Sequence, residues 1–348
     1  MRAFKLIFPI CLFSFVCICF FSCSETENPI MPTPPVDPSD TVDEYRWQTD
    51  TLVGNTIDNI YQLDSEHVYL ASYPKPFIYQ NRKFKAIGND DYDFYGIKIK
   101  AFSAGYVVAA GWKKINNTPQ YTGAFRVFKE SSIETFMLPS DTLTPDIIDM
   151  LIIAADDIWF ITGTNKLYHF NNGIYTVFSL SENLETISLL LKNNEVYVMA
   201  GVYNNIFTLN IFKFSGSEFT ITNSFTNPDY SNYIPFKIQN EFMFYDTYKL
   251  YSVNGNYLEP FSNLPNVRWA VYAGNSKQNI IRVQGLSYDP QFIYIWNGMR
   301  WKQEKGYVAS YAMGADKIGI SEVKNGYVYF FATSDKGISF IVEGKRKN

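Results

Sequence analysis

Seven short apolar segments recur along the chain about every 43 residues, and this repeat limits the possible folds more than any other feature. The segments are Val68–Leu70, Tyr106–Val108, Ile158–Phe160, Val196–Val198, Phe242–Phe244, Ile280–Arg282 and Val328–Phe330. Their central residues lie 38, 52, 38, 46, 38 and 48 residues apart. Such a period is typical of arrays in which each repeat buries its apolar face against the next one.

Each repeat has the pattern of four β-strands. After Tyr45 the chain has no useful helical period, and short apolar runs alternate with turn signals such as Asn172-Gly173 and Asn297-Gly298. The apolar segment would be the second strand, which neighbouring blades cover on both faces, so we expect its Trp159 and Tyr329 to be buried. The sequence therefore predicts an all-β fold, a seven-bladed β-propeller of four-stranded blades.

The last repeat lacks a fourth strand at its C-terminal end. Its predicted strands are Lys317–Val323, Tyr327–Thr333 and Ile338–Val342. Near the N-terminus, Tyr45–Asp50 resembles Met299–Glu304, the predicted fourth strand of the preceding blade. We therefore predict that this N-terminal strand completes and closes the last blade, which removes exposed sheet edges. The propeller domain is expected to span residues 45–348.

Residues 1–22 have the pattern of a signal peptide. Arg2 and Lys5 precede an apolar run that is too short to span a bilayer stably, and Ser22 places a small residue before Cys23. Residues 23–44 are polar and rich in proline, so we expect them to form an extended tether. All four cysteines lie within the first 23 residues, so the folded domain would form no disulfide.

This arrangement resembles a bacterial lipoprotein, in which the cysteine after the signal becomes the lipidated first residue of the mature protein. The resemblance implies lipidation of Cys23, attachment to a membrane through the lipid anchor, and a location in the cell envelope, at the outer membrane or the cell surface. Glu25 and Glu27 resemble the surface-export signal of some Bacteroidetes-type lipoproteins. The alternatives are an ordinary secretory signal cut nearby and an uncleaved membrane anchor.

Two segments, Asp157–Gly173 and Tyr329–Ile338, look like blades of the two-component-regulator type of β-propeller. Thr333–Phe340 resembles, more weakly, the Asp box of sialidase-like propellers, which is a structural turn in that family. The arginines of this chain sit mostly inside strand patterns and do not mark a sialidase cluster. These resemblances imply a fold and no particular reaction, because propellers host enzymes, binding proteins and scaffolds alike.

Composition and motifs argue against several classes of function. The net charge of −4 leaves no basic surface for a nucleic acid, so we expect none as partner. His67 and His169 are the only histidines and are predicted to be ordinary strand residues. Asn89–Asp93 carries three carboxylates but lacks the ligand spacing of a calcium loop. The sequence marks no catalytic residue, no metal site and no cofactor, and we predict none.

The longest stretches after predicted second strands are Gly111–Gly123, Gly201–Asn210 and Gly285–Gln291. In a propeller these connections open on one face. They carry Trp112, Tyr121, Tyr203 and Tyr288, which we expect to be partly exposed and gathered around one end of the channel. Exposed aromatic residues beside amides suit stacking on sugars or anchoring of a protein partner. The alternative is that the stretches are tolerated surface insertions.

These observations predict a monomeric, lipid-anchored binding protein of the cell envelope that recognises a glycan or an envelope protein through this face. One alternative is a glycan-active enzyme, a hydrolase or a lyase, with loop carboxylates at the mouth of the channel. Another is a scaffold subunit of an envelope complex. Carboxylates, an arginine and a tyrosine converging at the channel mouth would favour the enzyme, whereas aromatic residues without such a cluster would favour binding.

Overall fold

The computed structural model describes most of the chain after residue 40. The described residues are 41–89, 91–115, 118, 120–139, 147–164, 166–180, 184–203, 207–227, 234–238, 241–245, 249–254, 257–263, 270–284, 292–304, 315–334 and 337–347. Residues 38–348 form one compact unit. The predicted signal peptide, Cys23 and most of the predicted tether lie outside the described residues. Within the described part, no helix is long and apolar enough to cross a membrane.

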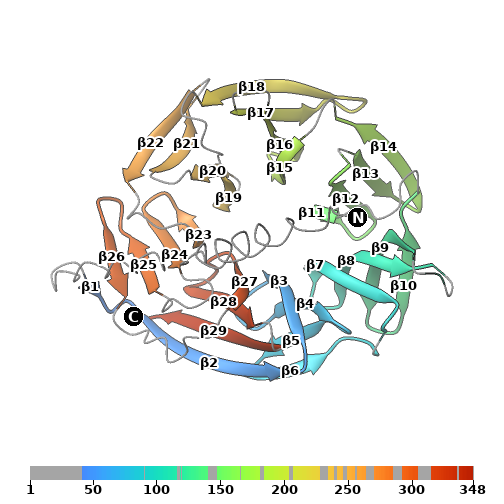
Figure 1. Ribbon diagram of the computed structural model, residues 1–348, viewed down its shortest axis with the longest axis horizontal. Helices are drawn as coiled ribbons and strands as arrows, with labels where there is room; N and C mark the ends of the chain where they lie inside the picture. The colour runs from blue at the N-terminus through green and yellow to red at the C-terminus, as the bar shows by residue number, and fades with distance from the viewer. Residues whose placement is uncertain are drawn as a thin grey trace, which may run out of the picture. The chain divides into compact units, whose positions relative to one another are not determined.

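Seven β-sheets follow one another around a ring, and each sheet is one blade (Figure 1). Blade 1 contains β3 (Thr56–Gln62), β4 (Val68–Tyr73), β5 (Phe77–Gln80) and β6 (Lys83–Ala86). Blade 2 contains β7 (Phe94–Ser103), β8 (Tyr106–Lys114), β9 (Tyr121–Lys129) and β10 (Ile133–Met137). Blade 3 contains β11 (Ile147–Ala154), β12 (Asp157–Thr162), β13 (Lys166–Asn171) and β14 (Ile174–Ser179).

Blades 4 to 7 repeat this antiparallel order from the centre outward. Blade 4 contains β15 (Leu184–Lys192), β16 (Glu195–Tyr203), β17 (Phe207–Phe214) and β18 (Phe219–Asn227). Blade 5 contains β19 (Ile234–Ile238), β20 (Glu241–Tyr245), β21 (Lys249–Asn254) and β22 (Tyr257–Asn263). Blade 6 contains β23 (Ala270–Ser276), β24 (Asn279–Gln284), β25 (Phe292–Trp296) and β26 (Trp301–Glu304). Blade 7 contains β27 (Ala315–Ile320), β28 (Tyr327–Ser334), β29 (Ile338–Arg346) and β2 (Tyr45–Val53).

The predicted fold class is confirmed: the chain is an all-β, seven-bladed propeller of four-stranded blades. The seven apolar segments all fall in second strands, from β4 to β28. Their side chains pack between blades; Phe125 of blade 2, for example, lies 4.6 Å from Phe160 of blade 3 between ring centroids. Trp159 and Tyr329 are each 2% exposed, as predicted. The core is therefore divided into layers between neighbouring blades.

The predicted closure is also confirmed, because β2 pairs antiparallel with β29 from Tyr45 opposite Arg346 to Val53 opposite Ile338. In Figure 1, β2 runs along the outside of β29. Tyr45 is fully buried between blades 6 and 7. The ring of Trp47 lies so close to Gly344 that a Cβ atom there would approach it to 2.4 Å. Only glycine leaves room for the closing strand at this point.

Hydrogen bonds of two side-chain hydroxyl groups also join the last blade to the first. Thr333 Oγ1 donates to the Ile57 carbonyl at 3.1 Å, and Ser339 Oγ donates to the Asn55 carbonyl at 2.8 Å. The Ile57 N–H donates to Ser339 Oγ at 3.1 Å. These two hydroxyl residues belong to the segment that resembles an Asp box, and in this chain they join blade 7 to the start of blade 1.

The structure adds one strand within the segment expected to be a tether. β1 (Thr41–Val42) pairs parallel with β26 and makes blade 6 five-stranded. Next to β1, the Glu44 N–H donates to Glu304 Oε2 at 3.0 Å, and Glu304 is buried, with 2% of its surface exposed. The N-terminal segment thus pairs with blade 6 through β1 and with blade 7 through β2.

Candidate functional site

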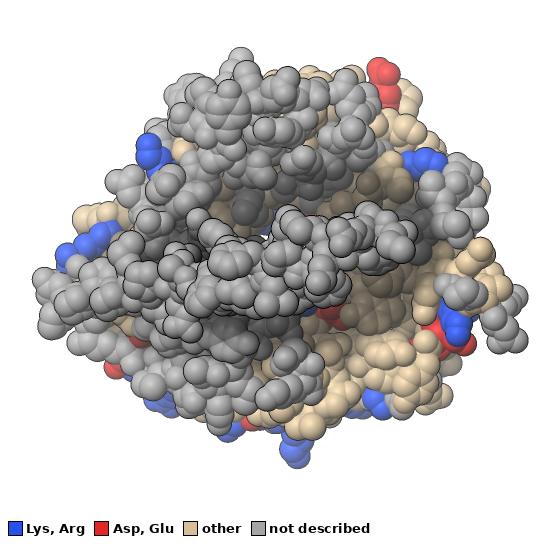
Figure 2. All heavy atoms as spheres, in the orientation of Figure 1, with Lys and Arg blue, Asp and Glu red and all other residues tan. Residues whose placement is uncertain are grey.

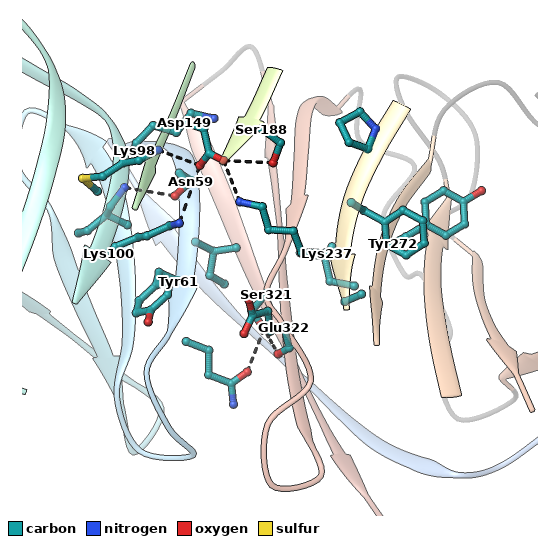
Figure 3. Close-up of a pocket in the computed structure, with 18 of the residues that line it drawn as sticks. Asn59, Tyr61, Lys98, Lys100, Asp149, Ser188, Lys237, Tyr272, Ser321 and Glu322 are labelled. Atoms are coloured by element: carbon teal, nitrogen blue, oxygen red, sulfur yellow. Dashed lines mark hydrogen bonds and ion pairs between the residues drawn. The ribbon is translucent and has the colours of Figure 1, made fainter. Parts of the chain in front are cut away.

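The first strands of all seven blades surround a central cavity of about 350 Å³. Figure 3 shows polar side chains from opposite sides of the ring pointing toward one another in it. The labelled residues are Asn59, Tyr61, Lys98, Lys100, Asp149, Ser188, Lys237, Tyr272, Ser321 and Glu322. We call this cavity the central channel. We call the face of the propeller at which the first strands begin and the second strands end the upper face.

A repeated irregularity places several of these polar residues. The pairing of the first and second strands shifts register just before Asn59 in β3, Lys98 in β7, Asp149 in β11 and Lys317 in β27. A β-bulge inserts one extra residue and redirects the side chains that follow it. Three of these residues, Asn59, Lys98 and Asp149, line the central channel.

Asp149 is the centre of the hydrogen-bond network in the central channel. Its Oδ1 accepts the Met150 N–H at 2.8 Å, and its Oδ2 accepts the Leu189 N–H at 2.8 Å and the Ser188 hydroxyl at 3.2 Å. The Lys237 ammonium also donates to Oδ2, at 2.8 Å. Three of these four hydrogen bonds go to Oδ2, so this oxygen is fully occupied, whereas Oδ1 accepts a single one.

Two further lysines, Lys98 and Lys100, line the channel near the Asp149 carboxylate. Lys100 Nζ lies 3.8 Å from Asp149 Oδ1, too far for a hydrogen bond, and no acceptor lies within hydrogen-bond distance of the Lys98 ammonium among the described residues. Burial lowers the pKa of Lys100 to about 8 and also lowers the pKa of Lys98. Three ammonium groups thus share one interior carboxylate.

The pKa of Asp149 reflects the same crowding. Burial alone would raise the pKa of this carboxyl, but the ammonium groups of Lys237, Lys100 and Lys98 together hold it well below its usual range. Asp149 is therefore a fixed anion and has no proton to give at neutral pH. Glu322, the other carboxylate of the lining, is an exposed side chain 3.5 Å from Lys324 Nζ, so it adds little to the interior balance.

Charged groups at the upper end of the channel are paired. Asp58 forms an ion pair with Lys317 there. Burial raises the pKa of Tyr95, and the nearby Asp58 carboxylate raises it further. On the face shown in Figure 2, the described basic and acidic side chains lie mainly around the edge and are interspersed. The described lining of the channel, by contrast, has more ammonium groups than carboxylates.

An aromatic cluster lies beside this upper end, between blades 1 and 2. It consists of Tyr73, Tyr92, Tyr95 and Trp112, which we call the upper aromatic cluster. Tyr95 stacks on Trp112 at 5.4 Å between ring centroids, and Tyr73 lies 5.3 Å from Tyr95 and 6.0 Å from Tyr92. Tyr92 is 66% exposed. Tyr121, which is 37% exposed, projects from the same side of the sheet as Trp112, because it pairs with Lys114, two residues further along β8.

The structure places two of the four predicted binding residues. Trp112 and Tyr121 lie at the upper face, on β8 and β9, whose pairing continues to Lys114 opposite Tyr121. The expectation of one long connection over Gly111–Gly123 is therefore wrong, because most of it extends the hairpin. The backbone of Tyr203 ends β16 at the upper face, but its side chain is outside the described residues, as is all of Tyr288.

The other candidates of the sequence have ordinary partners. Asp91 pairs with Arg126 and caps its own turn by accepting the Asp93 N–H at 2.8 Å; Asp90 lies outside the described residues. His169 Nε2 lies 2.8 Å from Asp157 Oδ1, and its ring stacks on Trp159. His67 Nδ1 lies 2.9 Å from Asp64 Oδ1 in a turn. Across the described part of the chain, no three metal-ligating side chains come together.

The enzyme hypothesis required an arginine and carboxylates at the channel mouth. Arg282 is fully buried within blade 6, with its guanidinium 5.6 Å from the Tyr294 ring centre and 5.9 Å from that of Tyr272. The described lining of the central channel contains lysines and no arginine. Its charged residues come from first strands except for Glu322, which follows β27 and lies near Lys324, whereas the hypothesis placed carboxylates on loops.

Sequence reasoning missed the lysines and Asp149. Their signal is a charged residue inside the first strand of several repeats, shortly before the apolar segment: Asp58, Lys98, Asp149, Lys237 and Lys317. In a strand at the centre of a ring, such a position faces the channel. Of the upper aromatic cluster, the sequence singled out Trp112 but not its three tyrosine neighbours.

Searches against known proteins identify relatives only by structure. No family model and no curated protein matches the chain. Similar solved structures include one described as YCF48 bound to D1 peptide, at 10% identity and a TM-score of 0.59, covering 86% of this chain and 96% of that one. YCF48 from Cyanidioschyzon merolae gives 11% identity and a TM-score of 0.58, with 86% and 98% covered. The WD40 propeller domain of Doa1 gives 10% and 0.56, with 88% and 98% covered.

These likenesses establish the fold alone. At such low identity a propeller neighbour says nothing about the residues of a site. The neighbours include chains solved with a peptide or within a protein assembly, the mitotic checkpoint complex among them.

Proposed function

We propose that this protein is a lipid-anchored binding protein of the cell envelope that captures a protein partner on the upper face of its propeller. The observation that carries the proposal is the upper aromatic cluster with its exposed member Tyr92, together with the exposed Tyr121 on the same side of the sheet as Trp112. Tyrosine and tryptophan are enriched among the residues that contribute most to protein interfaces. A rigid, partly buried cluster with an exposed edge loses little side-chain entropy when a partner docks on it.

The packing within the cluster favours a protein over a sugar. Stacking on a sugar requires an open ring face, but Tyr95 and Trp112 stack on each other at an interplanar angle of 18°. The exposed surface consists of the Tyr92 and Tyr121 side chains, which suit anchoring in a partner's surface. A glycan remains the second candidate, because these two exposed rings can also stack on a pyranose.

The enzyme alternative receives less support from the geometry. A glycosidase needs a pair of carboxyl groups, one of them protonated, on either side of the bond that is cleaved. Asp149 is ionised and occupied by four hydrogen bonds, and Asp58 is paired with Lys317. The described channel residues thus lack a free acid and base pair.

The membrane anchor rests on the sequence. Lipidation of Cys23 would place the propeller at the end of a tether of about 17 residues before β1, so that the domain can reach partners near a membrane surface. The envelope location, at the outer membrane or the cell surface, follows from the same signal.

The test uses the tagged mature chain in three forms: wild type, Tyr92→Ala/Tyr121→Ala, and Phe102→Ala. Phe102 is the matched control, because it is an exposed aromatic residue, 49% exposed, at the opposite end of β7. Each form is incubated with solubilised envelope extract, and the captured proteins are quantified. We expect a protein captured by wild type and Phe102→Ala to be lost from the double variant. Equal capture by all three would contradict the proposal, and binding of all three to a glycan array instead would favour the second candidate.

A further inference from the structure

We propose that the central channel is a binding site for a small anion, one carrying a carboxylate or a phosphate group, held by Lys98, Lys100 and Lys237. This site is separate from the upper aromatic cluster and does not depend on the proposed partner. Four observations support it: a cavity lined by all seven blades, a surplus of ammonium groups, a carboxylate that already accepts four hydrogen bonds, and a neutral donor held in place.

The cavity has the size of a small-molecule site. Its volume of about 350 Å³ lies within the range of ligand pockets in general, which starts near 300 Å³. First strands of seven blades form its wall, so the lining is a rigid scaffold. Preorganised groups on strands hold a ligand with less loss of entropy than groups on loops.

The lysines are not explained by structural pairing alone. The Lys237 ammonium joins blade 5 to blade 3 through its 2.8 Å bond to Asp149, and this is a structural role. Lys100 is 3.8 Å from the same carboxylate, and Lys98 has no acceptor among the described residues. An ammonium group has three donors, and partly buried charges are costly unless they are paired. An anion between Lys98 and Lys100 would supply the missing acceptors.

A neutral donor stands in the same lining. Asn59 Oδ1 accepts the Ile99 N–H at 3.2 Å, which fixes the orientation of the side-chain amide and leaves its NH2 group available as a donor. Donors without competing acceptors are the chemistry of carboxylate and phosphate sites, in which lysine acts as a point charge. A cation would instead meet three ammonium groups, beside a carboxylate that already accepts four hydrogen bonds.

The ligand class follows from charge and size. The described lining holds three lysines and two carboxylates, Asp149 and the more exposed Glu322, so a small anion of low charge balances it. A compact organic acid, a sugar acid or inorganic phosphate fits this chemistry. A long polyanion would require a basic surface outside the channel, where the charges seen in Figure 2 are mixed.

The test measures binding of inorganic phosphate, succinate and glucuronate to the mature chain by calorimetry, at constant ionic strength in chloride. The variants are Lys98→Gln and Lys98→Gln/Lys100→Gln, with the exposed Lys85→Gln as the charge-matched control. Since the Lys98 ammonium donates no hydrogen bond to the described residues, Lys98→Gln should fold like the wild type, and thermal unfolding checks this. We expect saturable binding of at least one probe that weakens roughly tenfold or more in Lys98→Gln and is unchanged in Lys85→Gln.

The outcomes separate the possible ligands. Binding of phosphate alone assigns a phosphate-bearing ligand, and binding of succinate or glucuronate alone assigns a carboxylate. Absence of saturable binding by all three probes, or binding that Lys98→Gln and the double variant leave unchanged, would overturn the proposal. None of these results depends on whether the upper face binds a protein.

Discussion

Removal of strand β2 should unfold the propeller, whereas removal of the residues before β1 should not. Deleting residues 24–53 takes away the whole ladder between β2 and β29, together with the fully buried Tyr45 and with Leu52, which is 8% exposed. Truncation of one buried aromatic side chain costs about 3–5 kcal/mol, and of one buried leucine about 2–5 kcal/mol. Their sum, about 5–10 kcal/mol, is comparable to the whole free energy of unfolding of a typical domain, about 5–15 kcal/mol.

Two shorter deletions serve as graded controls. Deleting 24–40 leaves β1 and β2 in place, so we expect a free energy of unfolding within about 0.5 kcal/mol of the full mature chain. Deleting 24–44 also removes β1 and the bond from the Glu44 N–H to Glu304, for which we expect a loss of about 1–3 kcal/mol because buried Glu304 loses a partner. Circular dichroism during thermal and urea unfolding measures all three. Equal stability of the 24–40 and 24–53 deletions would refute closure by β2.

Three further predictions concern the anchor, the core and the channel. Cys23→Ser should release the protein from membranes or block its maturation, as measured by fractionation, because stable attachment depends on the acyl chains; retention at the membrane with an intact signal would contradict lipidation. Trp159→Ala should lower the free energy of unfolding by about 3–5 kcal/mol, and Tyr121→Ala by less than about 0.5 kcal/mol; similar losses would show that the exposure argument fails. Burial lowers the pKa of Lys100 to about 8 in the folded protein, so between pH 8 and 10 the unfolded chain binds more protons than the folded one. The free energy of unfolding should therefore rise by about 2 kcal/mol from pH 7 to pH 9.5, relative to the change in Lys100→Met. Urea unfolding at pH 7 and pH 9.5 tests this, with Lys85→Met as control, and a parallel response of wild type and Lys100→Met would disprove it.

The fold was predictable because its signal is local and repeated. Each apolar segment lies in a strand covered on both faces, and seven copies at a regular spacing leave few architectures. Closure was predictable from the likeness of Tyr45–Asp50 to Met299–Glu304. The pairing of Thr41–Val42 with β26 was not predictable, because two residues in a polar, proline-rich segment show no strand pattern. They lie next to β26 because β2, which follows them, pairs with β29 in the neighbouring blade.

The site was predictable only in part, because its residues come together through the ring. Trp112 was singled out as an aromatic residue near the end of a second strand. Tyr73 reaches it from blade 1, Tyr92 from the connection before β7, and Tyr95 from the opposite position on β7. Asp149 and Lys237 are 88 residues apart and meet across the channel. A charged residue within a strand has no partner that a single sequence can name, so the convergence becomes visible only in three dimensions.

The most direct test of the proposed function is photo-crosslinking in intact cells. A photoreactive amino acid replaces Tyr121 at the upper face or Phe102 at the lower end of β7, two exposed aromatic positions. After irradiation, the anchored protein is purified under denaturing conditions and its adducts are separated by mass. Binding at the upper face predicts a discrete protein adduct from position 121 and none from position 102. An adduct from position 102 alone, or the same adducts from both positions, would contradict it.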